Sequence, residues 1–446
     1  MAMLNRIKQT CFGIARKLLS NRTKALAKKL YLRRVRRQAA GLHSRQETLW
    51  QAIREKAVIN VVFEMYHLGF WKSESLFRLM QGHPRFNPVI WVVPHYDGWD
   101  NEANAQASIQ YCRAQNFPYV THHDLSGFAV DEYPDILLPP EQYAFNFFRR
   151  YHRHGKPFLE HAICLIPYCY RNTTDHIDFN EHLQNIALFN FCENAYMAEL
   201  AGGIMDNHGC NLAVTGNPIA DIFALALAHP ENTRPAWKDT GKRLKRLIWS
   251  PHWTIKDVPG YYCASTFLQV CDTMLDIARR YAGRLQIAFK PHPGLYNELC
   301  LHPEWGKERA DAYYAHWRDM PNTQLEEGQY IDLFAQSDAL VHDSGSFIIE
   351  YLFTDKPCMY LQNGAGFGHF NRMSEDALQC HERGMDIEGF IQRAVLGGED
   401  TLQNATLGKH SASVTWNHPA AEARLRTLLS PCSENIFSSP APREHQ

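Results

Sequence analysis

The sequence has 446 residues, more than one hydrophobic core usually organises, so we expect two domains. Its apolar content of 45% excludes a largely disordered chain, and no run of 18 apolar residues predicts a transmembrane helix. The net charge of −1 says little, but the twelve scattered cysteines include no CxxC pair and indicate reduced thiols in a cytoplasmic protein, with no metal site and no cofactor expected.

Residues 1–45 are predicted to form a basic amphipathic helix. Twelve Lys or Arg residues lie between Arg6 and Arg37, and the first acidic residue is Glu47. An apolar face at helical spacing is formed by Leu4, Ile7, Cys11, Ile14 and Leu18. We expect this helix to lie on an anionic membrane surface. A solvated basic arm is the alternative, and a nucleic-acid contact is disfavoured.

A first α/β lobe is predicted for residues 46–235. Short apolar segments typical of buried parallel strands lie at 57–63, 87–94, 133–140, 161–170 and 210–214. Helices are predicted between them at 73–80 and 101–115. This alternation indicates a parallel sheet with helices on both faces.

Two loops of this lobe follow predicted strands, and either could face an acceptor. They are YHLGFWKSES (66–75) and PYCYRNTTDH (167–176). Tyr168, Arg171 and His176 are the candidate residues, with an ordinary polar loop as the alternative. The turn around Gly216 is interpreted as structural.

A polar linker at 229–243 leads into a second lobe, residues 236–429. Strands are predicted at 246–250, 285–289, 339–343 and 357–361, and helices at 265–281 and 347–353. Residues 430–446 are rich in Ser and Pro and are predicted to be disordered. We therefore expect two doubly wound, Rossmann-like lobes that face a central cleft, with ligands at the carboxyl ends of the strands.

The segment HDSGSFIIE (342–350) predicts a phosphate-binding turn between a strand and a helix. The backbone N–H groups of a helix start and the hydroxyls of Ser344 and Ser346 suit a phosphate, and Gly345 permits close approach. Asp343 ends the strand, and Glu350 lies one turn later, within reach of a ribose. The alternative is that Ser346 is only an N-cap and Asp343 only ends the strand.

Two further strand ends carry histidines. In FKPHPG, Pro291 and Pro293 hold His292 rigidly, so it could donate to a diphosphate or act as acid or base, while Lys290 supplies positive charge. In IWSPHW, His252 follows the first strand of the second lobe and is expected to point into the cleft. Surface or packed loop histidines are the alternatives at both positions.

Taken together, VTGNPIAD, IWSPHW, FKPHP and DLFAQSDALVHDSGSFIIEYLFTDKPCMYL resemble, in order and spacing, the CDP-glycerol glycerophosphotransferase superfamily. The resemblance covers roughly residues 57–365 and is stronger in the second lobe. It implies the GT-B fold and a role in teichoic-acid or capsular polysaccharide synthesis at the inner face of the cell membrane. By this resemblance His292 matches the donor-site histidine, Ser344 and Ser346 the diphosphate-binding serines, and Asp343 the acid before them.

The implied reaction is attack of an acceptor hydroxyl on the donor phosphorus, with CMP leaving. The expected ligands are CDP-glycerol or a similar donor and a polysaccharide or lipid-linked acceptor. The Trp-His-Gly-Thr motif of teichoic-acid polymerases is missing, so His176 is offered as a replacement base. Two alternatives stay open: a nucleotide-sugar glycosyltransferase or UDP-sugar 2-epimerase, in which Glu350 would bind ribose, and a non-catalytic, membrane-docked scaffold.

Overall fold

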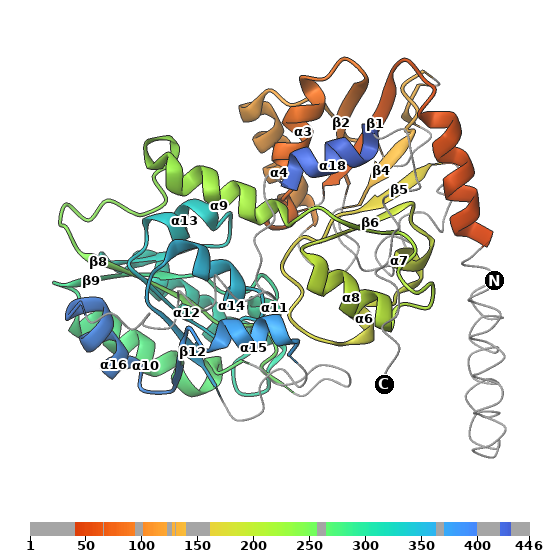
Figure 1. Ribbon diagram of the computed structural model, residues 1–446. Helices are drawn as coiled ribbons and strands as arrows, with labels where there is room; N and C mark the ends of the chain where they lie inside the picture. Colours follow the sequence, from red (N-terminus) through yellow and green to blue (C-terminus); the bar gives the residue numbers. More distant parts are fainter. Residues whose placement is uncertain are drawn as a thin grey trace, which may run out of the picture.

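The computed structural model of the protein describes residues 41–65, 67–93, 101–122, 127–129, 131–139, 161–256, 265–362, 370–398 and 420–429. These residues form two α/β lobes, each built on a parallel sheet (Figure 1). The predicted fold class is therefore confirmed. Residues 1–40 of the predicted basic helix and the predicted tail at 430–446 lie outside the described residues.

The first lobe contains a seven-stranded sheet with the order β3-β2-β1-β4-β5-β6-β7, in which all paired strands are parallel. Its strands are β1 (Ile59–Met65), β2 (Phe86–Val92), β3 (Tyr119–Val120), β4 (Ile136–Leu138), β5 (Ala162–Leu165), β6 (Phe189–Cys192) and β7 (Leu212–Val214). Its helices are α3 (Glu74–Gln81), α4 (Asn101–Gln115), α6 (His176–Phe179), α7 (His182–Ile186), α8 (Ala195–Ile204) and α9 (Pro218–Ala228).

The second lobe contains a six-stranded parallel sheet with the order β10-β9-β8-β11-β12-β13. Its strands are β8 (Lys245–Ser250), β9 (Leu285–Phe289), β10 (Thr323–Leu325), β11 (Ala339–His342), β12 (Cys358–Leu361) and β13 (Glu382–Gly384). Its helices are α10 (Phe267–Arg280), α11 (Leu295–Leu301), α12 (Gly306–Asp319), α13 (Ile331–Gln336), α14 (Phe347–Glu350), α15 (Arg372–Leu378) and α16 (Ile387–Phe390).

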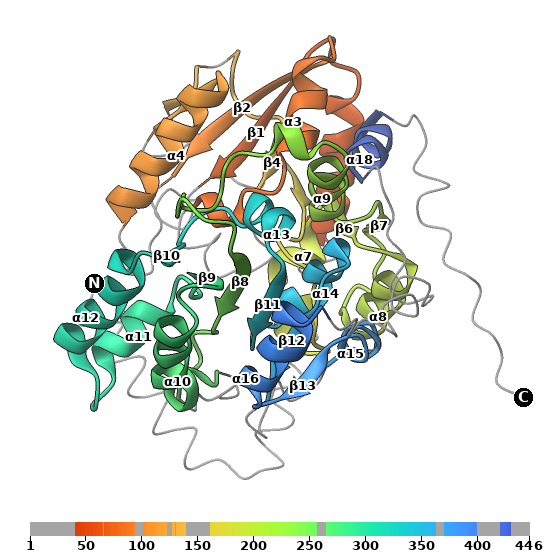
Figure 2. The ribbon, with the colours of Figure 1, turned by 90° about the vertical axis from the view of Figure 1, so that its left-hand side faces the viewer.

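Alternate residues of the central strands explain why helices cover both faces of the second sheet. Leu247 and Trp249 of β8 are buried against α10, α11, α12 and α16. Ile248, which lies between them, is buried against α13, α14 and α15 on the other face. Figure 2 shows these two groups of helices on opposite sides of β8 and β11. A strand with both faces buried is apolar throughout, which is why its sequence is a continuous apolar run.

The chain crosses between the lobes twice. Helix α9 leaves the first lobe and packs on α13 of the second lobe as well as on α3 (Figure 1). Helix α18 (Ala420–Leu429), at the end of the described chain, returns to the first lobe and packs on α3 and α9. The second domain was predicted to extend to residue 429, but this helix packs on the first lobe. The boundary expected at residue 45 also falls inside a helix, at 41–53, whose Trp50 and Ile53 enter the first-lobe core.

Helix α18 is held by a fully buried arginine. Arg424 donates a hydrogen bond to the carbonyl oxygen of Gly216, and the amide N–H of Ala421 donates to a carboxylate oxygen of Asp221 at 2.8 Å. Gly216 has a φ of 93°, a conformation that favours glycine, and Asn217 then caps α9. The turn at Gly216 therefore has a structural role, in agreement with its interpretation from the sequence.

Candidate functional site

A cavity between the two lobes lies at the carboxyl ends of both sheets. Its volume is about 250 Å³. In the sheets, β1 lies beside β4 and β8 beside β11, and at these pairs the strand order reverses, which is where such sheets bind ligands. The cavity is lined by residues from the loops that follow β1, β5, β8, β9, β10 and β11. Loops from both lobes therefore form one site.

Three histidines, His67, His252 and His292, line this cavity and share one local geometry. In each, the ring Nδ1 accepts a hydrogen bond from the backbone N–H two residues later, at 2.9 Å for Gly69, 3.4 Å for Thr254 and 3.0 Å for Gly294. An Nδ1 that accepts leaves the proton of a neutral ring on Nε2. The Nδ1 of His252 also lies 2.9 Å from Oγ1 of Thr254, a contact in which either group can donate. With Nδ1 as the acceptor, the imidazole of His292 can offer an Nε2–H donor to a ligand.

Burial keeps two of these rings neutral. It lowers the pKa of His252 to about 3. Burial also lowers the pKa of His292 well below its usual range, helped by electrostatic interactions with His252, Lys290 and His67 that disfavour a charged ring. The rings of His252 and His292 lie 5.0 Å apart between centroids. At neutral pH these two side chains are hydrogen-bond donors rather than cations.

Two buried lysines, one from each lobe, supply positive charge to the cavity. Lys72 follows β1, and its Nζ lies 4.2 Å from the centroid of the Tyr330 ring. Lys290 follows β9, and its Nζ lies 5.6 Å from the same centroid. Lys290 donates to the carbonyl oxygen of Gly328 at 3.0 Å. The Nζ of Lys72 has no hydrogen-bond partner among the described residues. Burial lowers the pKa of both lysines to about 8.

The serine turn after β11 meets the loop that follows β5 at the cavity. Ser344, Gly345 and Ser346 all line the cavity. The side chain of Ser346 makes no capping bond to α14, so the simple N-cap alternative is not what the structure shows. A Cβ on Gly345 would lie 1.8 Å from Nδ2 of Asn172, so glycine is what allows this first-lobe loop to approach.

Two acidic residues predicted to bind the donor do not line the cavity. Asp343 is fully buried, and its carboxylate accepts hydrogen bonds from the backbone N–H of His252 at 2.5 Å and of Thr266 at 2.6 Å. It therefore joins the loop after β8 to the start of α10. Glu350 is also fully buried and accepts from the hydroxyl of Tyr330 at 2.5 Å. Burial raises the pKa of Asp343 to about 6 and that of Glu350 to about 7.

The predicted first-lobe candidates have different positions. His176 is exposed at the start of α6 and does not line the cavity, although Asp175 and Asp178 on either side of it do. Arg171 lines the cavity, but its guanidinium pairs with Glu193 at 2.5 Å, and both side chains are buried. Tyr168 lines the cavity beside Phe70. His67 and Lys72 belong to the loop YHLGFWKSES that was expected to face the cleft, but neither was singled out from the sequence.

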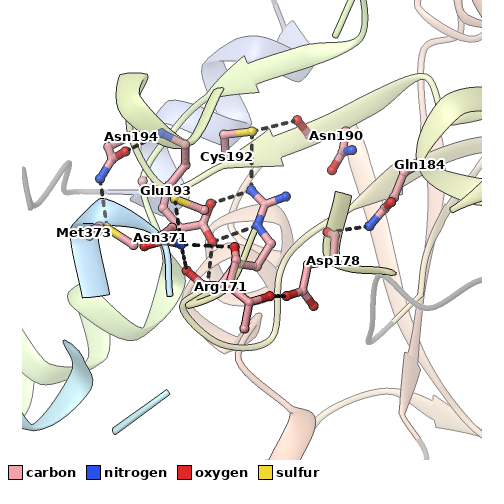
Figure 3. A network of polar contacts seen from close by, with 12 residues as sticks. Arg171, Asp178, Gln184, Asn190, Cys192, Glu193, Asn194, Asn371 and Met373 are labelled. Carbon is pink, nitrogen blue, oxygen red and sulfur yellow. Dashed lines mark hydrogen bonds and ion pairs between the residues drawn. The ribbon is translucent and has the colours of Figure 1, made fainter. Parts of the chain in front are cut away.

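The walls of the cavity are held together by a polar junction between the lobes (Figure 3). Asn371, at the start of α15, donates through Nδ2 to the carbonyl oxygen of Arg171 at 2.8 Å and accepts through Oδ1 from the N–H of Ser374 at 3.0 Å. Its own N–H donates to the carbonyl oxygen of Asn172 at 3.0 Å. Asn194 of the first lobe also contacts the sulfur of Met373 (Figure 3).

No protein-family model matches the chain, and no curated protein matches it. Among solved structures, it is similar to the wall teichoic acid polymerase TagF, at 12% identity over 90% of this chain and 94% of that one, with a TM-score of 0.52. It is also similar to the UDP-GlcNAc 2-epimerase from Neisseria meningitidis bound to UDP-GlcNAc, at 13% identity over 83% and 98% of the two chains, with a TM-score of 0.50. These similarities show a GT-B-like fold.

Proposed function

We propose that this protein is a transferase that moves a glycerol-phosphate, or another polyol-phosphate, from a CDP-activated donor to an acceptor hydroxyl in the synthesis of a teichoic-acid-like or capsular surface polymer. The observation that carries the proposal is the meeting of two buried lysines, Lys72 and Lys290, with His292 and the serine turn in one cavity between the lobes. The GT-B-like fold shared with a teichoic acid polymerase supports it.

The cavity suits a diphosphate because the buried ammonium of Lys72 has no hydrogen-bond partner among the described residues. An unpaired buried ammonium is costly, and a bound anion would offset that cost. We assign the neutralisation of the diphosphate to Lys72 and Lys290. The Nε2–H groups of His252 and His292 and the hydroxyls of Ser344 and Ser346 would donate to its oxygens.

In the proposed reaction, the acceptor hydroxyl oxygen attacks the phosphorus that carries the glycerol. The bond from this phosphorus to the bridging oxygen breaks, and CMP leaves with the electron pair. The hydroxyl proton passes to a general base. We assign His252 and His292 to stabilising the charge on the phosphate oxygens, because Nδ1 of each ring is already engaged, by the backbone N–H of Gly294 in His292 and by Thr254 in His252.

We assign the general base to Asp178. Three carboxylates of the described residues line the cavity, those of Asp175, Asp178 and Glu327. Asp178 alone of these is buried, and the hydroxyl of Thr173 donates to its carboxylate and orients it. It lies in the first lobe, on the acceptor side of the cavity, in place of the predicted His176.

A ligand panel tests this proposal. We expect CMP and CDP-glycerol to raise the melting midpoint by several degrees, because a ligand at 100 times its Kd stabilises the folded state by about 2.7 kcal/mol. UDP and UDP-GlcNAc at the same concentrations serve as the matched controls, and release of CMP from CDP-glycerol with an added polyol acceptor is followed by 31P NMR. A preference for uridine nucleotides would favour the epimerase or glycosyltransferase alternative. No shift with any nucleotide would favour the scaffold.

The place of action is part of the same proposal. We expect the protein to act at the cytoplasmic face of the cell membrane, with the basic segment 1–40 bound to anionic lipid. Within the part of the chain that the structure describes, no helix is long and apolar enough to cross a membrane.

A further inference from the structure

Three potential metal ligands lie together behind the serine turn, outside the cavity. They are His342 at the end of β11, Cys358 at the start of β12, and His381 just before β13. Their ligand atoms all lie within 4.8 Å of one another, and all three side chains are buried. The strands β11, β12 and β13 are neighbours in the sheet, so the topology brings together residues that are far apart in the sequence.

The tautomers of both histidines are fixed by the backbone. Nδ1 of His342 contacts the carbonyl oxygen of Ser344 at 3.0 Å, and Nε2 of His381 contacts the carbonyl oxygen of Ile348 at 2.7 Å. A carbonyl oxygen only accepts, so these two nitrogens carry the protons. The remaining nitrogens, Nε2 of His342 and Nδ1 of His381, are therefore lone-pair acceptors. Among the described residues, neither has a hydrogen-bond partner.

Two unsatisfied imidazole nitrogens beside a thiol, at full burial, call for an explanation. Histidines that bind metal usually donate their other ring N–H to a backbone carbonyl or carboxylate, which is the arrangement of both rings here. A thiolate with two imidazoles is a ligand set that suits zinc. We propose that His342 Nε2, Cys358 Sγ and His381 Nδ1 bind a zinc ion, with a water molecule as the fourth ligand.

The proposed ion needs only small side-chain movements. In a tetrahedral site with metal–ligand distances of about 2.1–2.3 Å, ligand atoms lie roughly 3.5 Å apart, so any two of the three need to approach by at most about 1.3 Å. Zinc replaces the proton of the Cys358 thiol, which is released to solvent, and the cluster then carries a net charge of +1. The sequence predicted no metal site because these residues do not have the spacing of a zinc motif.

The site would fix the serine turn. Both histidines donate to carbonyl oxygens of the segment that contains it, those of Ser344 and Ile348. An ion that binds both rings therefore ties this segment to β12. The proposal does not depend on which donor the cavity binds, because metal content is measured without nucleotide.

Metal analysis of the full chain tests the proposal. The protein is produced with a tag that contains no histidine, in zinc-supplemented medium, and is dialysed against metal-free buffer. Inductively coupled plasma mass spectrometry is expected to find about one zinc per chain. Cys358→Ser and His381→Gln should lose most of it. Cys271→Ser, which removes a buried thiol of the same lobe with no metal ligands assigned to it, is the matched control and should keep it.

Cobalt substitution keeps the test decisive if the variants do not fold. Wild-type protein exchanged into Co2+ should show a thiolate-to-cobalt charge-transfer band in the near ultraviolet and the intense visible bands of a tetrahedral site. Folded wild-type protein that contains no transition metal after growth with zinc would overturn the proposal. Zinc that persists at the wild-type level in a folded Cys358→Ser variant, or cobalt bound without a thiolate band, would overturn it as well.

Discussion

At the scale of single residues, Lys72 carries the most information about the ligand. The residue is 2% exposed, its ammonium has no hydrogen-bond partner among the described residues, and burial lowers its pKa to about 8. The ring of Tyr330 and the carboxylate of Glu350 offset only part of the cost. Local arrangements that cost stability are expected at functional sites, where a ligand compensates for them.

Replacing Lys72 should weaken ligand binding but stabilise the ligand-free protein. We expect Lys72→Met to weaken CDP-glycerol binding by about tenfold or more, because a charge-assisted contact to phosphate is lost. The same change should raise the melting midpoint of the ligand-free protein, because a buried charge is removed. Calorimetric titration and thermal unfolding measure the two effects. Lys356→Met, which removes another partly buried lysine far from the cavity lining, is the control and should leave binding unchanged.

The lowered lysine pKa values also set a pH dependence. Because Lys72 and Lys290 lose their protons at about pH 8 in the folded state but near 10.5 when unfolded, the unfolded chain binds more protons between these values. The contribution of these lysines to the free energy of unfolding therefore rises as pH increases from about 8 to 10.5. Ligand binding should weaken over the same range, and Lys72→Met should flatten both profiles. A variant that binds as tightly as wild type would contradict the role given to Lys72.

Asp178 is tested by an isosteric change. Asp178→Asn keeps the shape of the side chain but cannot accept the acceptor proton, so we expect kcat to fall by about 100-fold or more with little change in donor affinity. The neighbouring cavity residue Asp175 provides the matched control, and Asp175→Asn should stay within a few-fold of wild type. Single-turnover assays with CDP-glycerol separate chemistry from binding. Full activity in Asp178→Asn would remove it as the base.

At the scale of secondary-structure elements, the junction at the start of α15 fixes one lobe against the other. Asn371 performs two tasks, because Oδ1 caps the helix while Nδ2 donates across the junction to Arg171. The isolated bridge between Thr173 and Phe370 runs beside it. These backbone-directed contacts add to an apolar cluster that joins the lobes, in which Met197 of the first lobe and Met373 of α15 are both buried.

The variant Asn371→Asp separates those two tasks. An aspartate still caps α15, but its second oxygen would face the carbonyl oxygen of Arg171 instead of donating to it. We expect the free energy of unfolding to fall by about 1–3 kcal/mol, the usual effect of leaving buried polar groups unpaired. Asp386→Asn, which exchanges the exposed cap of α16, should change it by less than about 0.5 kcal/mol. Equal urea midpoints for Asn371→Asp and wild type would show that the junction contributes nothing.

The burial and length of each element explain which elements could be predicted from the sequence. Central strands such as β1, β8 and β11 are buried on both faces, so their apolar runs are continuous and easily recognised. Strand β6 was missed because a buried Asn190 interrupts its apolar run, and the edge strands β3, β10 and β13 are only two or three residues long. The residues of helix α18 were assigned to the second lobe, because their sequence does not say which apolar surface the helix covers.

The sequence could predict those site residues that directly follow a parallel strand. Loops that follow parallel strands meet at one edge, so the sequence placed His252, Lys290, His292 and the serine turn together, and the structure has them in one cavity. Asp343 and Glu350 were assigned to the donor because spacing does not show whether a carboxylate points outward or inward. Lys72 and His67 were missed because their loop reaches the second lobe only through the packing of the two lobes, which the sequence does not show.

At the scale of the whole molecule, the two sheets place their switch points on either side of one cavity. The strand orders β2-β1-β4 and β9-β8-β11 are the same, so both lobes direct the loops of their first strands into it. The first lobe supplies Lys72 and Asp178, and the second supplies Lys290, His292 and the serines. Neither lobe alone contains the set of residues that the proposed reaction needs.

The most direct test of the central claim is a crystal structure of the full chain with CDP-glycerol or CMP bound. We predict electron density for the phosphates between the two lobes, within hydrogen-bonding distance of His292 Nε2 and the hydroxyl of Ser344 or Ser346, with Lys72 and Lys290 beside them. A nucleotide bound elsewhere, or one whose phosphates face solvent while these side chains contact none of them, would contradict the account.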